Sequence, residues 1–195
     1  MADSLFRLFV ACELSGEVRA ALAAVQDQLR HAGAGRLRWV RPEGIHVTLK
    51  FLGEVEADRV DAICAALGPA VEPFSIRVRP AGLGGFPDAS ARLRVVWVGL
   101  EGDIDALAAL AGRVDRALEP LGFPREARPF AAHLTLARVR DEASAEERRR
   151  LADLVAGQTP APLPELLLTR LHLVRSVLQP DGAVYQRLAS FPPEA

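Results

Sequence analysis

The 195-residue sequence predicts an α+β fold with mostly antiparallel strands, and three observations lead to this fold class. Segments with the periodicity of strands and segments with the periodicity of helices alternate along the chain. Several connections between them are short, which suits antiparallel pairing because parallel strands need long crossovers. The order strand, helix, strand pair, helix in the first part is loosely echoed later, although no close repeat is visible.

Strand alternation and helical stripes define the first elements. In chain order they are a strand over 5–12, a helix over 17–31, strands over 36–40 and 45–52, and a helix over 57–67. In the first strand Leu8, Val10 and Cys12 alternate onto one face. The first helix gathers its apolar residues on one stripe and ends at a glycine-rich tract. A turn containing Pro and Gly separates the two short strands, and Gly68 and Pro69 end the second helix.

The second half continues the same alternation. Its predicted elements are strands over 74–79, 93–100 and 133–139, helices over 103–118 and 145–155, and closing strands over 166–177 and 184–188. Residues 82–87 are predicted as a loop, because glycine and proline interrupt the strand pattern. The helix over 103–118 is amphipathic, with Leu107 and Leu110 on its core side. The proline-rich residues 160–164 are predicted as a linker.

Composition and charge favour a soluble globular protein, since half of the residues are apolar and a quarter are charged. The net charge of −1 excludes a strong basic field, so any nucleic acid is expected to be held at one end rather than along its backbone. Cys12 and Cys64, the two cysteines, are expected to be reduced thiols. We expect no signal peptide, and no uncharged run approaches the roughly 20 residues that span a bilayer. The expected compartment is the cytoplasm.

Two segments of the chain share one unusual pattern. Residues 46–49 read His-Val-Thr-Leu and residues 133–136 read His-Leu-Thr-Leu, in a chain with four histidines. One such match would be explained by a structural histidine and by the preference of threonine for strands. Two matches, one in each half, predict a functional site.

Strand geometry gives the spacing a chemical meaning. Successive side chains point to opposite faces, so His46 and Thr48 share one face, as do His133 and Thr135. Two imidazoles on opposite sides of a phosphorus are suited to act as acid and base near neutral pH. The threonine hydroxyls are suited to donate hydrogen bonds to non-bridging phosphate oxygens. This chemistry requires neither a metal nor a cofactor, and we expect none, because the usual metal-ligand spacings do not occur in the sequence.

The residues around both motifs resemble the two-histidine phosphoesterases, and within them the RNA 2′,3′-cyclic phosphodiesterases, also described as bacterial and archaeal 2′-5′ RNA ligases. The resemblance runs from residues 7–11 through 39–53 and 130–138 to 173–188. It implies a single two-lobed domain over residues 1–195, with pseudo-twofold symmetry, a central cleft lined by mostly antiparallel sheets, and helices packed outside. Relatives often have proline before the second histidine, where this chain has Ala132.

The resemblance also implies roles for named residues. His46 would protonate the departing 3′-oxygen and His133 would accept a proton from water, leaving a 2′-phosphomonoester. Thr48, Thr135 and Arg138 would bind the substrate phosphate. The symmetry of the motifs leaves the two histidine roles interchangeable on the residues alone. The implied partners are RNA ends or small cyclic nucleotides, with no membrane and no obligate protein partner, so we expect a monomer.

Other functions stay open at this point. The same site would suit 2′-5′ linked oligonucleotides or another cyclic ribose phosphate, and weak 2′-5′ ligation would be the same reaction run backwards. A non-catalytic protein that binds RNA ends is the third hypothesis.

The alternation of side chains along a strand, or the residue type alone, gives expectations for several further residues. Alternation puts Lys50 on the face of His46 and Thr48, but puts Arg138 away from His133 unless the strand bulges. His172 is expected to be structural. Large aromatic residues are candidates for the core, and one of them is a candidate for stacking on a base. These aromatic residues are Phe9, Phe51, Trp97, Phe130 and Tyr185.

Overall fold

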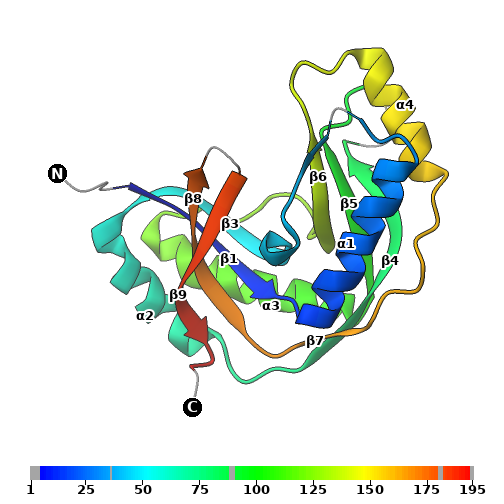
Figure 1. The fold of residues 1–195 in the computed structure, drawn as a ribbon. Coiled ribbons are helices and arrows are strands. Elements are labelled where there is room, and N and C mark those ends of the chain that lie inside the picture. The colour runs from blue at the N-terminus through cyan, green and yellow to red at the C-terminus, as the bar shows by residue number, and fades with distance from the viewer. Residues whose placement is uncertain (1–4, 36, 88–90, 180–181, 194–195) are drawn as a thin grey trace.

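Two β-rich lobes are joined along one sheet in the computed structural model, which describes residues 5–35, 37–87, 91–179 and 182–193 (Figure 1). The strands are β1 (Leu5–Glu13), β2 (Leu37–Trp39), β3 (His46–Glu56), β4 (Ile76–Phe86), β5 (Val95–Gly102), β6 (His133–Val139), β7 (Leu166–Leu168), β8 (Leu171–Gln179) and β9 (Gly182–Phe191). The helices are α1 (Gly16–His31), α2 (Val60–Ala70), α3 (Ile104–Leu118) and α4 (Ala145–Ala156), with 3₁₀ turns η1 (Pro42–Gly44), η2 (Ala57–Arg59) and η3 (Glu119–Leu121). The α+β prediction is confirmed.

The sheet holds its strands in the order β7-β4-β5-β6-β3-β1-β8-β9, with β2 also beside β6. Every pairing is antiparallel. Among the described residues, β3 and β6 pair at one position, Val47 opposite Leu134. We call the strands β1, β3, β8 and β9, with α2 and α3, the first lobe. We call β2, β4, β5, β6 and β7, with α1 and α4, the second lobe (Figure 1).

The first helix of each half is exchanged between the lobes. Helix α1 follows β1 of the first lobe, yet its buried Gln26 donates to the carbonyl oxygen of Leu136 in β6, at 2.9 Å. Helix α3 follows β5 of the second lobe, yet its Asp115 pairs with Lys50 of β3. One hydrophobic core therefore contains residues from both halves of the chain.

The helices form where the sequence predicts them. The Ser15 hydroxyl caps α1 by accepting a hydrogen bond from the Val18 amide at 3.3 Å. In α4, Ser144 and Glu147 form a reciprocal capping box. The buried faces of α1 and α3 follow the predicted apolar stripes, which for α1 means Val18, Leu22, Val25 and Leu29.

The glycine tract predicted as a loop over 82–87 belongs to strand β4 as far as Phe86, so that prediction was wrong. The glycines are there because neighbouring side chains approach the backbone closely. A Cβ atom on Gly84 would lie 2.3 Å from the Trp97 ring, and one on Gly85 would lie 2.1 Å from Leu93. Gly82 has φ +64°, at the bulge where the β4–β5 register shifts.

Three further elements differ from the prediction in their boundaries. The strand expected over 166–177 is two strands, because the chain leaves β4 of the second lobe after β7 and joins β1 of the first lobe as β8. Helix α2 continues through Gly68 and Pro69, since Ile63 and Leu67 are fully buried and hold its last turns against the core. The predicted strand over 36–40 is observed over residues 37–39, and residue 36 lies outside the described residues.

Both cysteines are free thiols, with Cys12 buried in β1 and Cys64 partly buried in α2. Burial raises the pKa of the Cys12 thiol to about 12. None of the helices in the described part of the chain is long and apolar enough to cross a membrane.

Candidate active site

The two His-x-Thr motifs meet where β3 pairs with β6. Val47 and Leu134 are directly opposite each other, and both are fully buried on the core face of the sheet. The side chains on either side of this pair point to the other face, where all four are partly exposed. These four side chains are His46, Thr48, His133 and Thr135. His46 and His133 are diagonal neighbours across the Val47–Leu134 pair. In a regular antiparallel ladder, diagonal neighbours lie about 7–8 Å apart.

Each imidazole is held by the same local hydrogen bond. His46 Nδ1 lies 2.7 Å from the carbonyl oxygen of Gly44, and His133 Nδ1 lies 2.7 Å from that of Ala131. A carbonyl oxygen only accepts, so Nδ1 carries the proton in both rings. Nε2 is therefore the nitrogen that remains for proton transfer in each motif.

Aromatic rings frame both histidines. The His46 ring stacks on Phe9, with centroids 4.6 Å apart, and meets the Tyr185 ring edge-on at 5.2 Å. The His133 ring meets Phe86 edge-on at 5.0 Å and lies 6.5 Å from Trp97. Such contacts fix the ring planes in addition to the Nδ1 hydrogen bonds.

His46 is electrostatically unlike an exposed histidine. Burial, above all, lowers the pKa of His46 from 6.5 to about 4, because charging a buried ring is unfavourable. The hydrogen bond to Gly44 and the charge of Glu13 act in the opposite direction, while the charges of His133 and Arg138 lower the pKa further. His46 is therefore neutral at pH 7 in the free protein, and it lies within electrostatic range of the second histidine.

Glu13 is an acidic neighbour of the site that the sequence motifs did not indicate. It is the cross-strand partner of His46 at the end of β1. Burial acts to raise the pKa of Glu13, but the hydrogen bond from Arg187 and the charges of His172, Arg187 and Arg19 outweigh it and lower the pKa. Arg187 Nη2 lies 2.7 Å from a carboxylate oxygen of Glu13. Glu13 therefore presents a fixed negative charge beside His46.

Both motif strands bulge at the leucine that the two motifs share. In β3, Thr48 faces Ala11 and Lys50 faces Val10, so Leu49 is the extra residue. In β6, a register shift of the same kind makes Leu136 the extra residue. A bulge reverses the alternation of side chains that follows it. The shared leucine thus marks a structural feature that periodicity alone does not reveal.

The bulges decide which charged residues face the site. Lys50, expected beside His46 and Thr48, instead is 8% exposed and pairs with Asp115, with Nζ also 2.8 Å from the carbonyl oxygen of Pro124. The prediction that Lys50 shares the face of His46 and Thr48 was therefore wrong. Phe51 takes the place on the site face and is 64% exposed.

Arg138 occupies the position in β6 that corresponds to Phe51 in β3. Its neighbours Ala137 and Val139 are buried, so the exposed Arg138 shares the face of His133 and Thr135. The charge of Arg138 also acts on His46 and on Tyr185. The bulge thus brings Arg138 to the site, although strict alternation placed it on the opposite face.

A buried glutamine supports the bulge in β6. Gln26 of α1 is 1% exposed, and its side-chain amide donates to the carbonyl oxygens of Val40 at 2.7 Å and of the bulged Leu136 at 2.9 Å. The Leu136 carbonyl oxygen also accepts from the Val40 amide at 2.9 Å, so Gln26 ties together the two backbone segments that meet at the bulge. Residue type alone gave no signal for Gln26, because its partners lie 14 and 110 residues away.

The other two histidines, His172 and His31, make hydrogen bonds outside the two motifs. His172 is 5% exposed, and its Nδ1 lies 3.0 Å from the Ser190 hydroxyl, while His31 Nδ1 lies 2.7 Å from the carbonyl oxygen of Asp27 in the last turns of α1. Across the described residues, no group of three or more His, Cys, Asp or Glu side chains is placed to hold a metal ion. The site offers two opposed imidazoles, two hydroxyls and one guanidinium, which suits acid–base chemistry on an anion.

Each half of the chain separately matches the sequence model of one protein family, described as LigT like phosphoesterase, over residues 13–97 and 98–185. Curated relatives include the RNA 2′,3′-cyclic phosphodiesterase of Archaeoglobus fulgidus, 33% identical over 95% of this chain and 99% of its own length. The protein of the same name from Methanothermobacter thermautotrophicus is 31% identical over 95% of this chain and 97% of its own length.

Solved structures show the same fold. A crystal structure of a Thermus thermophilus protein has a TM-score of 0.72 and 30% identity, covering 95% of this chain and 96% of the other. Escherichia coli LigT complexed with 3′-AMP has a TM-score of 0.75 and 25% identity, covering 98% and 99%. The separate matches of the two halves agree with the order of strands and helices, which is loosely repeated between the two halves of the chain.

Proposed function

The chain belongs to the LigT-like phosphoesterase family, and on that basis we propose that it hydrolyses the 2′,3′-cyclic phosphate at RNA ends to a 2′-phosphomonoester. The observation that carries the proposal is the meeting of two His-x-Thr motifs on one sheet face, each imidazole presenting Nε2. The identity of about a third with proteins named RNA 2′,3′-cyclic phosphodiesterase supports the choice of substrate.

The reaction is an in-line displacement at phosphorus. His133 Nε2 accepts a proton from water as the water oxygen bonds to phosphorus, and His46 Nε2 donates a proton to the 3′-oxygen as the bond from that oxygen to phosphorus breaks. Thr48, Thr135 and Arg138 donate to the non-bridging oxygens, where negative charge increases in the transition state. The two histidines end with their protonation states exchanged, and solvent restores them.

His46 acquires its proton together with the substrate. Its pKa of about 4 in the free protein keeps it neutral, whereas a donor must be charged. A phosphate anion beside the ring favours the charged form and offsets the cost of burial and the repulsion from His133 and Arg138. Binding of the anion is therefore coupled to proton uptake at His46.

The activity test uses a 2′,3′-cyclic nucleotide and a short RNA with a cyclic phosphate end, in excess chelator. We expect turnover without added metal, and a 2′-phosphate product. His46→Ala and His133→Ala should each lower kcat by roughly 10²–10⁴-fold, the usual contribution of a general acid or base. Near-normal turnover in either variant, or complete dependence on a metal, would contradict the mechanism.

A substrate with a different leaving atom distinguishes the histidine that donates a proton from the histidine that accepts one. When sulfur replaces the departing 3′-oxygen, the thiolate leaves without needing a proton, because it is a much weaker base than an alkoxide. His46→Ala should recover activity on this thio substrate relative to the oxygen substrate, and His133→Ala should not. The opposite result would interchange the donor and the acceptor.

The remaining expectations concern the protein as a whole. A cytoplasmic location fits two free thiols, since disulfides prevail in oxidising compartments. A monomer is expected in solution, which light scattering at several concentrations would test.

A further inference from the structure

Two arginines lie directly opposite each other at the end of the site face in the second lobe. Arg38 of β2 is the cross-strand partner of Arg138 of β6, and both side chains are exposed. Their strand neighbours Leu37, Ala137 and Val139 are buried, so both arginines point away from the core and share the site face. The site face therefore continues beyond Arg138 onto strand β2.

Like charges at opposite positions of an antiparallel pair are unfavourable in the free protein. Another arginine of the sheet shows the usual arrangement, because Arg79 of β4 lies opposite Glu101 of β5 and forms an ion pair with it at 2.8 Å. Among the described residues, no carboxylate pairs with Arg38 or Arg138, and no hydrogen bond occupies either guanidinium. Two adjacent cations of this kind are suited to bind an anion from outside the chain.

The arginine pair lies near the position proposed for the reacting phosphate, but extends beyond it. Thr135 faces Trp97 of β5, and Arg138 faces Val95, which is two residues away on the same strand. At about 3.4 Å per residue, the arginine pair is roughly 7 Å from Thr135 along the sheet. Arg38 is displaced from Arg138 by one further strand. Arg138 is thus placed between the reacting phosphate and Arg38, where a second phosphate would lie.

We propose that Arg38, together with Arg138, binds the phosphodiester on the 5′-oxygen of the terminal ribose, so that the site selects RNA ends over free cyclic mononucleotides. This proposal rests on the proposed function. A chain that ends in a cyclic phosphate carries this phosphodiester one ribose away from the reacting phosphorus, and a cyclic mononucleotide lacks it. The planar guanidinium fork suits such a group, because it donates paired hydrogen bonds to two phosphate oxygens.

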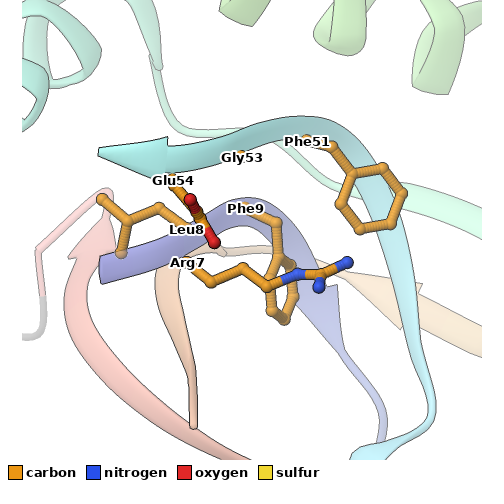
Figure 2. A pocket seen from close by; sticks show the side chains of 6 residues that line it. All are labelled: Arg7, Leu8, Phe9, Phe51, Gly53 and Glu54. Atoms are coloured by element: carbon orange, nitrogen blue, oxygen red, sulfur yellow. The ribbon is translucent and has the colours of Figure 1, made fainter. Parts of the chain in front are cut away.

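The first lobe offers a less favourable place for this phosphate. Its exposed Arg7 has Glu54 as cross-strand partner, and both residues line a hollow of about 160 Å³ together with Phe9 and Phe51 (Figure 2). The carboxylate of Glu54 repels a phosphate and offsets the charge of Arg7. The arginine pair carries positive charge on both of its strands, so the second lobe attracts the phosphodiester more strongly.

The test removes one charge from the protein and one from the RNA. Calorimetry compares adenosine 2′-monophosphate, the dinucleotide ApA with a 2′-phosphate end, and the same dinucleotide with an uncharged methylphosphonate linkage. Arg38→Gln should weaken binding of the charged dinucleotide about tenfold, the effect of one charge-assisted hydrogen bond at an exposed site. Binding of the other two ligands should not change, because neither carries the phosphodiester charge.

Two controls separate a specific contact from a general effect of charge. Arg116→Gln changes the net charge equally, at an exposed position on α3, and should leave all three affinities unchanged. For the charged dinucleotide, Arg38→Gln should reduce the slope of log Kd against log salt concentration by about 0.7, as expected for one phosphate contact on a single strand. The same substitution should not lower stability to urea, since it removes a repulsion.

Turnover gives the corresponding comparison for substrates. Arg38→Gln should raise KM about tenfold for ApA with a cyclic phosphate end, while kcat and the KM of adenosine 2′,3′-cyclic phosphate stay unchanged. The binding measurements require no turnover, so they test the arginine pair even if the protein hydrolyses no cyclic phosphate. Equal loss of affinity for both dinucleotides, loss for all three ligands, or no loss for any of them would overturn the proposal.

Discussion

At the scale of single residues, His46 is defined by its surroundings rather than by its sequence motif. The same Nδ1 hydrogen bond holds both histidines, but Phe9, Tyr185 and the end of β1 surround His46. Burial then makes the charged ring unfavourable, so the imidazole of His46 is neutral at pH 7 in the free protein. Two histidines in matching motifs therefore differ in their surroundings because of packing.

The depressed pKa of His46 predicts a pH dependence of stability. The unfolded chain binds a proton at its ordinary pKa near 6.5, and the folded chain only near 4, so stability falls as pH falls between these values. Lowering the pH from 7.5 to 5 should reduce the free energy of unfolding by about 2 kcal/mol through His46. Urea unfolding of the wild type and of His46→Gln at both pH values isolates this contribution. An equal loss in both proteins would exclude it.

At the scale of elements, the bulges are the features on which the site depends. Each motif strand presents histidine and threonine in strict alternation, then inserts a leucine, and only then presents Phe51 or Arg138. Helix α1 contacts the bulged residue of β6 directly, because Gln26 donates a second hydrogen bond to the Leu136 carbonyl oxygen, which also accepts from the Val40 amide. A helix from the first half of the chain thus contacts the motif strand from the second half.

Gln26→Leu tests this support. The substitution removes one buried and one partly buried hydrogen bond and should destabilise the protein by about 1–3 kcal/mol. It should also lower kcat/KM, because the bulge sets the position of Arg138. In an Arg138→Gln background, Gln26→Leu should cause no further loss of activity. Gln28→Leu, on the same helix but hydrogen-bonded to Gln158, is the control and should leave activity unchanged.

Substitution of Lys50 should lower the stability of the protein without lowering its activity, because the Lys50 side chain faces the core and not the site. Lys50→Met leaves the Asp115 carboxylate, 17% exposed, without its partner and should cost roughly 3 kcal/mol of stability. KM and kcat should remain near normal, as Lys50 does not reach the site. Arg79→Gln, which breaks the exposed pair with Glu101, should cost less than about 1 kcal/mol. A large rise in KM for Lys50→Met would contradict the observed orientation.

At the scale of the whole molecule, the exchanged helices tie the lobes together. The first lobe packs against α3 from the second half of the chain, and the second lobe packs against α1 from the first half. Neither lobe keeps its core if the other unfolds, since the buried residues form one main cluster. The two-lobed shape is therefore expected to behave as one domain.

Cooperative unfolding is the consequence to measure. Trp39 and Trp97, the two tryptophans, both lie in the second lobe, while the buried thiol of Cys12 lies in the first. Tryptophan fluorescence and thiol labelling, in a Cys64→Ser protein, should give coincident midpoints in urea. Two separate midpoints would show that the lobes are independent domains.

The sequence by itself determined the chemical groups of the site and most of the elements. Spacing predicted that His46 and Thr48 share one strand face and that His133 and Thr135 share another, because the alternation of side chains along a strand is local covalent geometry. The boundaries of α3 and β6 followed from periodicity in the same way. The glycine tract of β4 was misassigned, because the close approach of Trp97 to Gly84 is invisible to local patterns.

Only the tertiary structure decided which neighbours these groups acquire. The bulges that turn Phe51 and Arg138 to the site depend on register between strands far apart in sequence. The burial that lowers the pKa of His46 depends on rings from β1 and β9. Register, desolvation and helix exchange are long-range effects, whereas residue spacing records local geometry alone.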